Sequence, residues 1–74
     1  TCNALILGLV ATDIYQRGSF DKHIVQKMVD AVPMSRMGKT EEVSNVATFL
    51  CSHQASFITG ALITVDGGMS LGAR

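Results

Sequence analysis

The sequence predicts an α/β fold that contains part of a parallel β-sheet, in the order strand, helix, helix, strand. Hydrophobic residues make up 47% of the chain, charged residues 16%, and there is one proline, a composition typical of a buried α/β interior. Two short apolar runs lie on either side of two helical patterns, and strands joined through helices are usually parallel. With 74 residues, a self-sufficient core is not expected. We therefore interpret residues 1–74 as one incomplete domain, a piece of a larger unit.

The first apolar run, Cys2–Leu7 (CNALIL), is nearly continuous and ends at Gly8. This pattern fits a strand that is buried on both faces. Such a strand needs a neighbour on each side, and the chain offers one, so we expect a further strand partner outside this chain. The next residues include Thr12 and Asp13, which favour turns, and they predict a loop at the end of the strand.

Residues 18–33 predict an amphipathic helix that begins after Ser19 as N-cap and ends before Pro33. Its apolar residues recur at spacings of four, four and three: Phe20, Ile24, Met28 and Ala31. A second helix is predicted from Thr40, a capping residue followed by two glutamates that suit the first turn, to about Ser52. Its apolar stripe comprises Val43, Val46, Ala47 and Leu50. Phe49 lies off that stripe, so we expect burial on more than one side.

The second strand is predicted at Ala61–Val65 (ALITV), where β-branched residues are frequent. Asp66-Gly67-Gly68 follows and predicts a turn in which the glycines adopt unusual φ angles. We interpret residues 57–68 as a whole as the edge of a sheet.

Charge and cysteine content exclude several classes of function. Six basic and six acidic side chains balance, which argues against nucleic acid or an anionic membrane as partner. The longest apolar run has four residues, far fewer than the roughly 20 that span a bilayer. Cys2 and Cys51 are isolated, so we expect buried, reduced thiols and neither a zinc site nor a disulfide. Arg17 and Arg36 are interpreted as surface or loop-bracing residues.

Four stretches in order resemble the C-terminal part of a short-chain dehydrogenase/reductase, with similarity to 3-oxoacyl-ACP-reductase-like members. CNALILGLVATD resembles "VNxIxPGxIxTD", and VPMSRMGKTEEV resembles "IPLGRxGxPEEV". FLCSHQASFITG resembles "FLASDxASYITG", and ALITVDGG resembles "xLxVDGG". The resemblance implies a Rossmann-type doubly wound parallel sheet, of which this chain forms the C-terminal part.

The resemblance also implies an NAD or NADP cofactor and a carbonyl/alcohol substrate. In the family, the loop after the strand that corresponds to Cys2–Leu7 faces the nicotinamide. The resemblance therefore implies a cofactor role for Gly8, Val10 and Thr12. Val10 would bind the carboxamide through its backbone, and the Thr12 hydroxyl would contact the carboxamide or the pyrophosphate. Leu7 stands where the family usually has proline, so we expect a looser turn there.

Residues 13–35 correspond to the family's variable substrate-binding segment. Its four candidate substrate contacts are Tyr15, Phe20, Ile24 and Met28. Their helical spacing fits plain core packing equally well, so both interpretations stay open. No metal ligands are predicted.

None of the family's catalytic residues is matched within residues 1–74. Tyr15 is the single tyrosine, and Ser19 stands four positions later where Tyr-x-x-x-Lys requires lysine. The resemblance places the catalytic Ser, Tyr and Lys before Thr1, and we expect this chain alone to be inactive. The first hypothesis is therefore a fragment of an NAD(P)-dependent oxidoreductase.

The second hypothesis is a non-catalytic, truncated oligomerisation module. Under either hypothesis, the resemblance implies a homo-oligomer that forms through Thr40–Ser52 and Ala61–Val65. A cytoplasmic location is expected, with mitochondrion and peroxisome left open.

Overall fold

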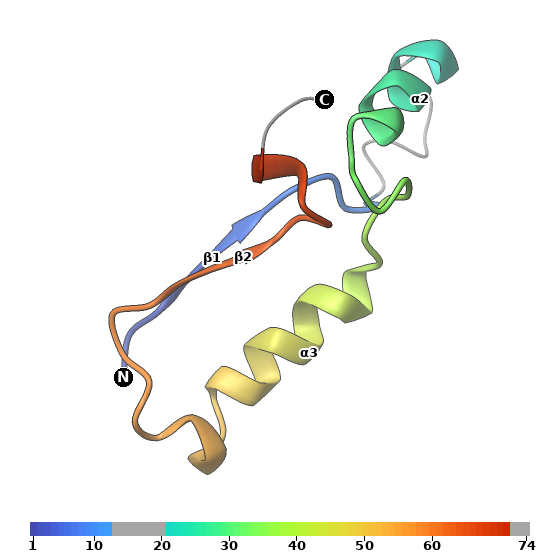
Figure 1. Ribbon diagram of the computed structural model, residues 1–74. Helices are drawn as coiled ribbons and strands as arrows, with labels where there is room; N and C mark the ends of the chain where they lie inside the picture. Colours follow the sequence, from blue (N-terminus) through green and yellow to red (C-terminus); the bar gives the residue numbers. More distant parts are fainter. Residues whose placement is uncertain (13–20, 72–74) are drawn as a thin grey trace.

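The computed structural model describes residues 1–12 and 21–71 of the chain. It contains β1 (Ala4–Leu7), α2 (Lys22–Asp30), α3 (Thr40–Leu50) and β2 (Leu62–Val65), as Figure 1 shows. Two short 3₁₀ helices follow α3 and β2, at His53–Ala55 and Met69–Leu71. The predicted order of strand, helix, helix and strand is confirmed.

The two strands are parallel and pair from Ala4 with Leu62 to Leu7 with Val65. β1 begins two residues later than predicted because the residues before it bond to the loop that precedes β2. The backbone N–H of Cys2 donates to Thr59 Oγ1 at 3.1 Å, and the Asn3 side chain accepts from the backbone N–H of Ala61 at 2.9 Å. These bonds set the register before the ladder begins.

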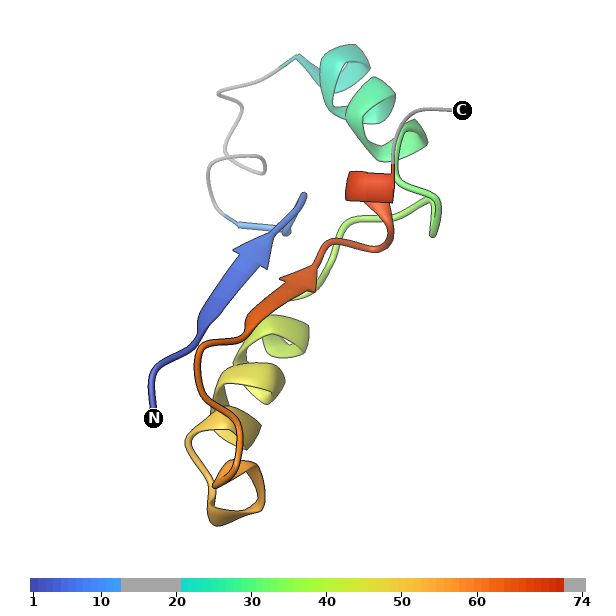
Figure 2. The ribbon, with the colours of Figure 1, turned by 60° about the vertical axis from the view of Figure 1, so that its left-hand side comes forward.

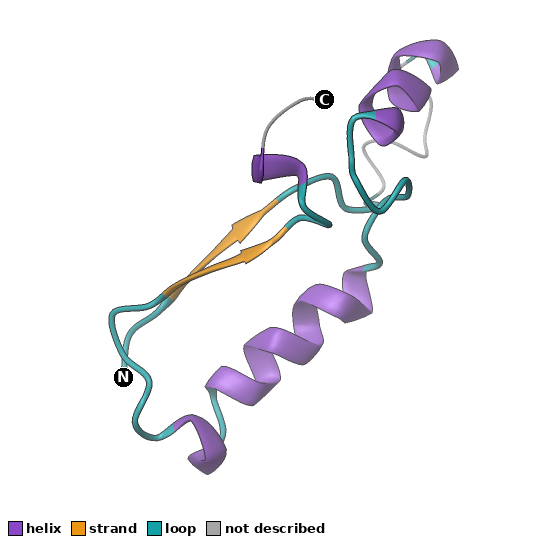
Figure 3. Ribbon diagram, viewed as in Figure 1, coloured by secondary structure: helices purple, strands orange, loops and turns teal. Residues whose placement is uncertain are grey.

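The expectation that β1 is buried on both faces is wrong for this chain. Ile6 and Leu7 are 46% and 49% exposed. Among the residues that the structure describes, β1 pairs with β2 alone, and α3 lies along one face of the sheet (Figures 2 and 3). The alternate residues Leu5, Ile63 and Val65 are half-buried, which gives the strand pair one partly covered face.

Helix α2 begins at Lys22, and its N-cap is Asp21, not Ser19. Asp21 Oδ1 accepts the backbone N–H of His23 at 2.7 Å, which satisfies a free amide of the first turn. Ser19 lies outside the described residues. α2 buries none of its residues, and Ile24 is 52% exposed, because the helix extends beyond the carboxyl end of the sheet (Figure 1).

Helix α3 begins at Thr40 as predicted, but Lys39 is its N-cap residue. The Glu42 carboxylate accepts the backbone N–H of Lys39 at 2.8 Å, whereas the Thr40 hydroxyl donates to Glu41 Oε1 at 2.7 Å. The predicted stripe is half-buried at Val43, Val46 and Leu50, and no residue of α3 is fully buried. Phe49 is exposed, so the expected burial on a second side is wrong for this chain.

The buried core of the described chain consists of Leu9, Val10, Val32 and Ala55. The radius of gyration is 14.2 Å, whereas a compact domain of this length has about 11 Å. Both cysteines are exposed, which corrects the expectation of buried thiols, because a core this small does not cover them. These features are those of an incomplete domain.

None of the helices in residues 1–12 and 21–71 is long and apolar enough to cross a bilayer.

Candidate functional site

The carboxyl ends of both strands meet at one edge of the sheet, where ligands of parallel α/β folds usually bind. The backbone N–H of Gly8 donates to Val65 O at 3.1 Å, which extends the ladder past β1. A Cβ atom at Gly8 would lie 2.5 Å from Asp66 Cβ and 2.9 Å from Asp66 Cα. Gly8 therefore allows the two strand ends to approach closely.

The turn after β2 is built on two glycines and one carboxylate. Gly67 and Gly68 have φ angles of 64° and 93°, which confirms the unusual backbone predicted for them. The Asp66 carboxylate accepts the backbone N–H of Ser70 at 2.8 Å and that of Gly68 at 2.9 Å. These two bonds hold the pKa of Asp66 below its usual value. The turn lies directly beside Gly8, so the edge of the sheet and the loop form one structural unit.

The loop after β1 is held by a short parallel bridge to Gly38. Ala11 N–H donates to Gly38 O at 2.8 Å, and Gly38 N–H donates to Leu9 O at 2.9 Å. In such a bridge the backbone groups of the central residue, Val10, point away from Gly38. Val10 O accepts the N–H of Thr12 at 2.8 Å, and no hydrogen bond from Val10 N–H is formed within the described residues. One backbone donor is thus directed away from Gly38.

The structure therefore brings Gly8, Val10 and Thr12 together on one loop at this edge. Val10 is buried and Thr12 is exposed. Tyr15 and Phe20 lie outside the described residues, and Ile24 and Met28 lie on α2. The role of Gly38 was missed because residues 33–39 carry no periodic pattern in the sequence.

Leu7 stands where the resemblance implies proline, and the hydrogen bonds from β1 to β2 are intact there. Ala4 N–H and Gly8 N–H both donate to the β2 side, at Ala61 O and Val65 O. Because donors of a parallel strand alternate in direction, Leu7 N–H points away from β2. Proline at this position would remove no bond to β2, and the looser turn expected with leucine stays a prediction.

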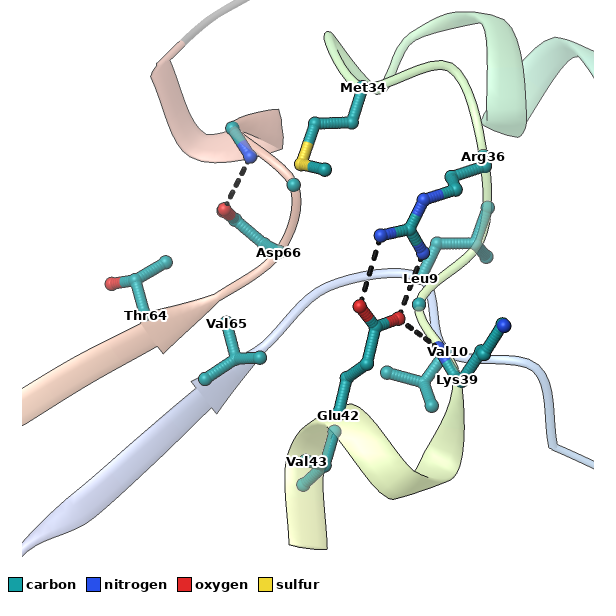
Figure 4. Close-up of a pocket in the computed structure, with 13 residues that line it drawn as sticks. Leu9, Val10, Met34, Arg36, Lys39, Glu42, Val43, Thr64, Val65 and Asp66 are labelled. Atoms are coloured by element: carbon teal, nitrogen blue, oxygen red, sulfur yellow. Dashed lines mark hydrogen bonds and ion pairs between the residues drawn. The ribbon is translucent and has the colours of Figure 1, made fainter. Parts of the chain in front are cut away.

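The segment that carries Gly38 is fixed by an ion pair with two hydrogen bonds. Arg36 Nη1 and Nη2 donate to Glu42 Oε1 and Oε2 at 2.8 and 3.0 Å, as Figure 4 shows. Glu42 Oε1 also accepts the backbone N–H of Lys39 at 2.8 Å. The bond from Arg36, followed by that from the Lys39 backbone, lowers the pKa of Glu42 to about 2. The interpretation of Arg36 as a loop-bracing residue is confirmed.

Glu42 is expected to make stability depend on acid pH. Its folded-state pKa of about 2 lies below the ordinary 4.5, so its contribution is present above pH 4.5 and is lost as the pH falls toward 2. Glu42→Gln, which cannot ionise, should flatten this part of the stability curve. Urea midpoints at pH 7, 4 and 3 measure the effect. Glu41→Gln is the comparison. The Thr40 hydroxyl also lowers the pKa of Glu41, but this variant keeps the Arg36–Glu42 bonds and should flatten the curve less. Equal pH slopes for the two variants would contradict the expectation.

A hollow of about 290 Å³ lies between the edge of the sheet, the 34–39 segment and the first turn of α3 (Figure 4). Its apolar lining includes Leu9, Val10, Met34, Val43 and Val65, with the Arg36–Glu42 pair beside them. Within residues 1–12 and 21–71, no group of three or more His, Cys, Asp and Glu residues could hold a metal ion. The arrangement suits binding and orientation through backbone groups.

Comparisons with known proteins agree on one family. The family described as enoyl-(acyl carrier protein) reductase matches residues 1–70. The 3-oxoacyl-[acyl-carrier-protein] reductase FabG of Aquifex aeolicus is 45% identical over 67 residues, which cover 90% of this chain and 26% of that protein. The L-rhamnose 1-dehydrogenase (NAD(P)(+)) of Azotobacter vinelandii is 37% identical over 68 residues, which cover 92% of this chain and 27% of that protein.

Solved structures give the same result. A short chain dehydrogenase from Bacillus anthracis superposes with a TM-score of 0.78 at 29% identity, covering 97% of this chain and 27% of that one. A structure from Agrobacterium tumefaciens with bound NADP superposes with a TM-score of 0.84 at 28% identity, covering 95% and 28%. The chain thus spans about a quarter of the length of the relatives that it matches.

Proposed function

Since this chain belongs to the short-chain dehydrogenase/reductase family, we propose that it forms the nicotinamide-side part of an NAD(P)-dependent oxidoreductase that acts on a carbonyl/alcohol pair. The observation that carries the proposal is the backbone of Val10. Its N–H points away from the Gly38 bridge at the carboxyl edge of the sheet, where a carboxamide oxygen could accept it.

Three residues would have separate roles in holding the cofactor. Val10 N–H would donate to the carboxamide, and the exposed Thr12 hydroxyl would bind the carboxamide or the pyrophosphate. Gly8 would keep the loop close to Asp66, because any side chain there would collide with it. NAD or NADP, when bound, would supply or accept the hydride. The residues of this chain would orient the ring and leave proton transfer to other residues.

Substrate would lie on the α2 side of the same edge. Ile24 and Met28 remain candidate contacts, together with Tyr15 and Phe20, because α2 extends beyond the sheet and buries none of its residues. Without the family's Ser, Tyr and Lys, residues 1–74 alone would not turn over substrate.

A hybrid enzyme tests the proposal. The matching segment of the Aquifex aeolicus reductase would be replaced by this chain, with the truncated reductase as the control. We expect the hybrid to oxidise NADH or NADPH with a 3-oxoacyl thioester, and the truncated enzyme to be inactive. A hybrid that is folded by circular dichroism and still binds neither dinucleotide would contradict the proposal.

The second candidate function is an oligomerisation module. Phe57 is fully exposed, and Phe49 on α3 and Leu62 on β2 are exposed as well, so large apolar groups lie on and beside the two elements assigned to the interface. A second copy packing there would cover them. Sedimentation velocity of the 74-residue chain tests this function. A dimer or larger assembly is expected, and a folded monomer at high micromolar concentration would contradict it.

A further inference from the structure

We propose that Arg36 and Glu42 act as a positioning clamp that orients the Val10 backbone through Gly38, although neither side chain is among the candidate cofactor contacts. The inference rests on the proposed function, because it assigns a role to residues that support the candidate nicotinamide loop. It adds Arg36 and Glu42, as positioning residues, to the candidate contacts Gly8, Val10 and Thr12.

The clamp fixes the 36–39 segment from one carboxylate. Both oxygens of Glu42 accept from the Arg36 guanidinium, at 2.8 and 3.0 Å, and one of them also accepts the N–H of Lys39 at 2.8 Å. Arg36 Nη1 further donates to Met37 O at 3.1 Å. A planar guanidinium with two parallel bonds sets direction as well as distance. Gly38 therefore lies between Met37, whose carbonyl oxygen accepts from Arg36, and Lys39, whose N–H donates to Glu42.

Gly38 transmits this geometry to the loop. Its N–H and C=O bond to Leu9 O and Ala11 N, the residues on either side of Val10. Within the described part of the chain, residues 9–11 form no other hydrogen bonds to a different segment. A rotation of the Gly38 peptide would consequently rotate the peptide groups around Val10.

The segment depends on the clamp because it has little regular structure of its own. Residues 33–39 contain no helix or strand, and Ser35 has a φ angle of 61°, in the left-handed region that non-glycine residues rarely adopt. Ordering such a segment costs conformational entropy. The bonds from Met34 N–H to Gly67 O and from Ser35 N–H to Val32 O hold its first half, and the three bonds to Glu42 hold its second half. Lysine at position 36 would keep the charge and lose the paired geometry.

The test uses the hybrid enzyme with Arg36→Met, Arg36→Lys and the matched control Lys39→Met. Lys39→Met removes one positive charge from the same segment and keeps the backbone N–H that Glu42 binds. Kinetics give the KM of the dinucleotide and of the 3-oxoacyl thioester separately. Hydrogen exchange followed by mass spectrometry reports the peptide that contains residues 9–12.

Arg36→Met should raise the dinucleotide KM about tenfold, because residues that act through a network of contacts change the coupling between sites by roughly two- to thirtyfold. The thioester KM should change less than about twofold, as expected for a defect confined to cofactor orientation. Exchange at Ala11 should accelerate, Arg36→Lys should give an intermediate effect, and Lys39→Met should match the parent hybrid.

Two results would overturn the clamp. The first is an active hybrid in which Arg36→Met and Lys39→Met have the same dinucleotide KM. The second is unchanged exchange of residues 9–12 in Arg36→Met, a measurement that does not require activity. If Arg36→Met does not fold, Glu42→Gln replaces it. A parent hybrid without dinucleotide binding would count against the proposed function alone, because exchange still tests the clamp.

Discussion

Gly8→Ala is expected to lower the free energy of unfolding of the hybrid enzyme by about 1 to 3 kcal/mol, the usual cost of overpacking. The added Cβ would lie 2.5 Å from Asp66 Cβ and 2.9 Å from its backbone Cα, distances at which atoms must move apart. Because the Cα atom belongs to the backbone of Asp66, a side-chain rotation cannot relieve the contact. The ladder bond from Gly8 N–H to Val65 O, 3.1 Å long, should weaken as the strand ends separate.

Urea denaturation followed by circular dichroism measures this effect, and the dinucleotide KM should rise with it. Gly38→Ala is the matched control, because its Cβ would meet Leu9 O at 3.7 Å, an ordinary contact distance. The control should change stability by less than about 1 kcal/mol. Equal urea midpoints for the two variants would show that the strand ends tolerate separation, and would remove the role assigned to Gly8.

Gly67→Ala is expected to have a comparable effect for two reasons. Its φ angle of 64° costs an L-residue about 1 to 2 kcal/mol. Its Cβ would also lie 2.8 Å from Cγ1 of Val32, one of the four buried residues. The contact with Val32 should add about 1 to 3 kcal/mol, because a buried side chain has little room to move.

Gly60→Ala separates these two contributions. Gly60 has a similar φ angle of 75°, and no heavy atom lies within 4 Å of its Cβ position. It should therefore show the backbone cost alone, and the urea midpoint of Gly67→Ala should fall further. Adding Val32→Ala to Gly67→Ala should restore part of the difference, since residues in contact do not behave additively. Equal losses at Gly60 and Gly67 would mean that the turn does not pack against Val32.

Much of the site follows from local sequence, and the packed turn shows why. The positive φ angles of Gly67 and Gly68 were predicted because glycine tolerates them and an apolar run ends there. The loop at Gly8–Thr12 was predicted because turn-forming residues follow an apolar strand. In contrast, nothing near Gly8 in the sequence indicates that Asp66 lies against it, since that contact joins residues far apart in the chain.

The remaining differences have the same origin. The N-caps of α2 and α3 are Asp21 and Lys39, whereas Ser19 and Thr40 were predicted. The position of a cap depends on local backbone angles, which several neighbouring polar residues could satisfy. Burial on more than one side was predicted for α3, and core packing was one of two interpretations left open for the α2 stripe. Burial, however, requires a covering surface. Periodicity shows which face of a helix is apolar and leaves open how much of a partner is present.

The sequence by itself determined the parallel strand pair, the two helices, the glycine turn and the family, because each depends on local propensity or on a motif read along the chain. Only the tertiary structure decided the bridge from Gly38 to the Val10 loop, the Arg36–Glu42 pair and the exposure of the two cysteines. These features depend on which distant segments meet, and backbone bonds such as those of Gly38 are available to any residue type. A sequence pattern therefore does not indicate the Gly38 bridge, and it does not identify Glu42 as the partner of Arg36.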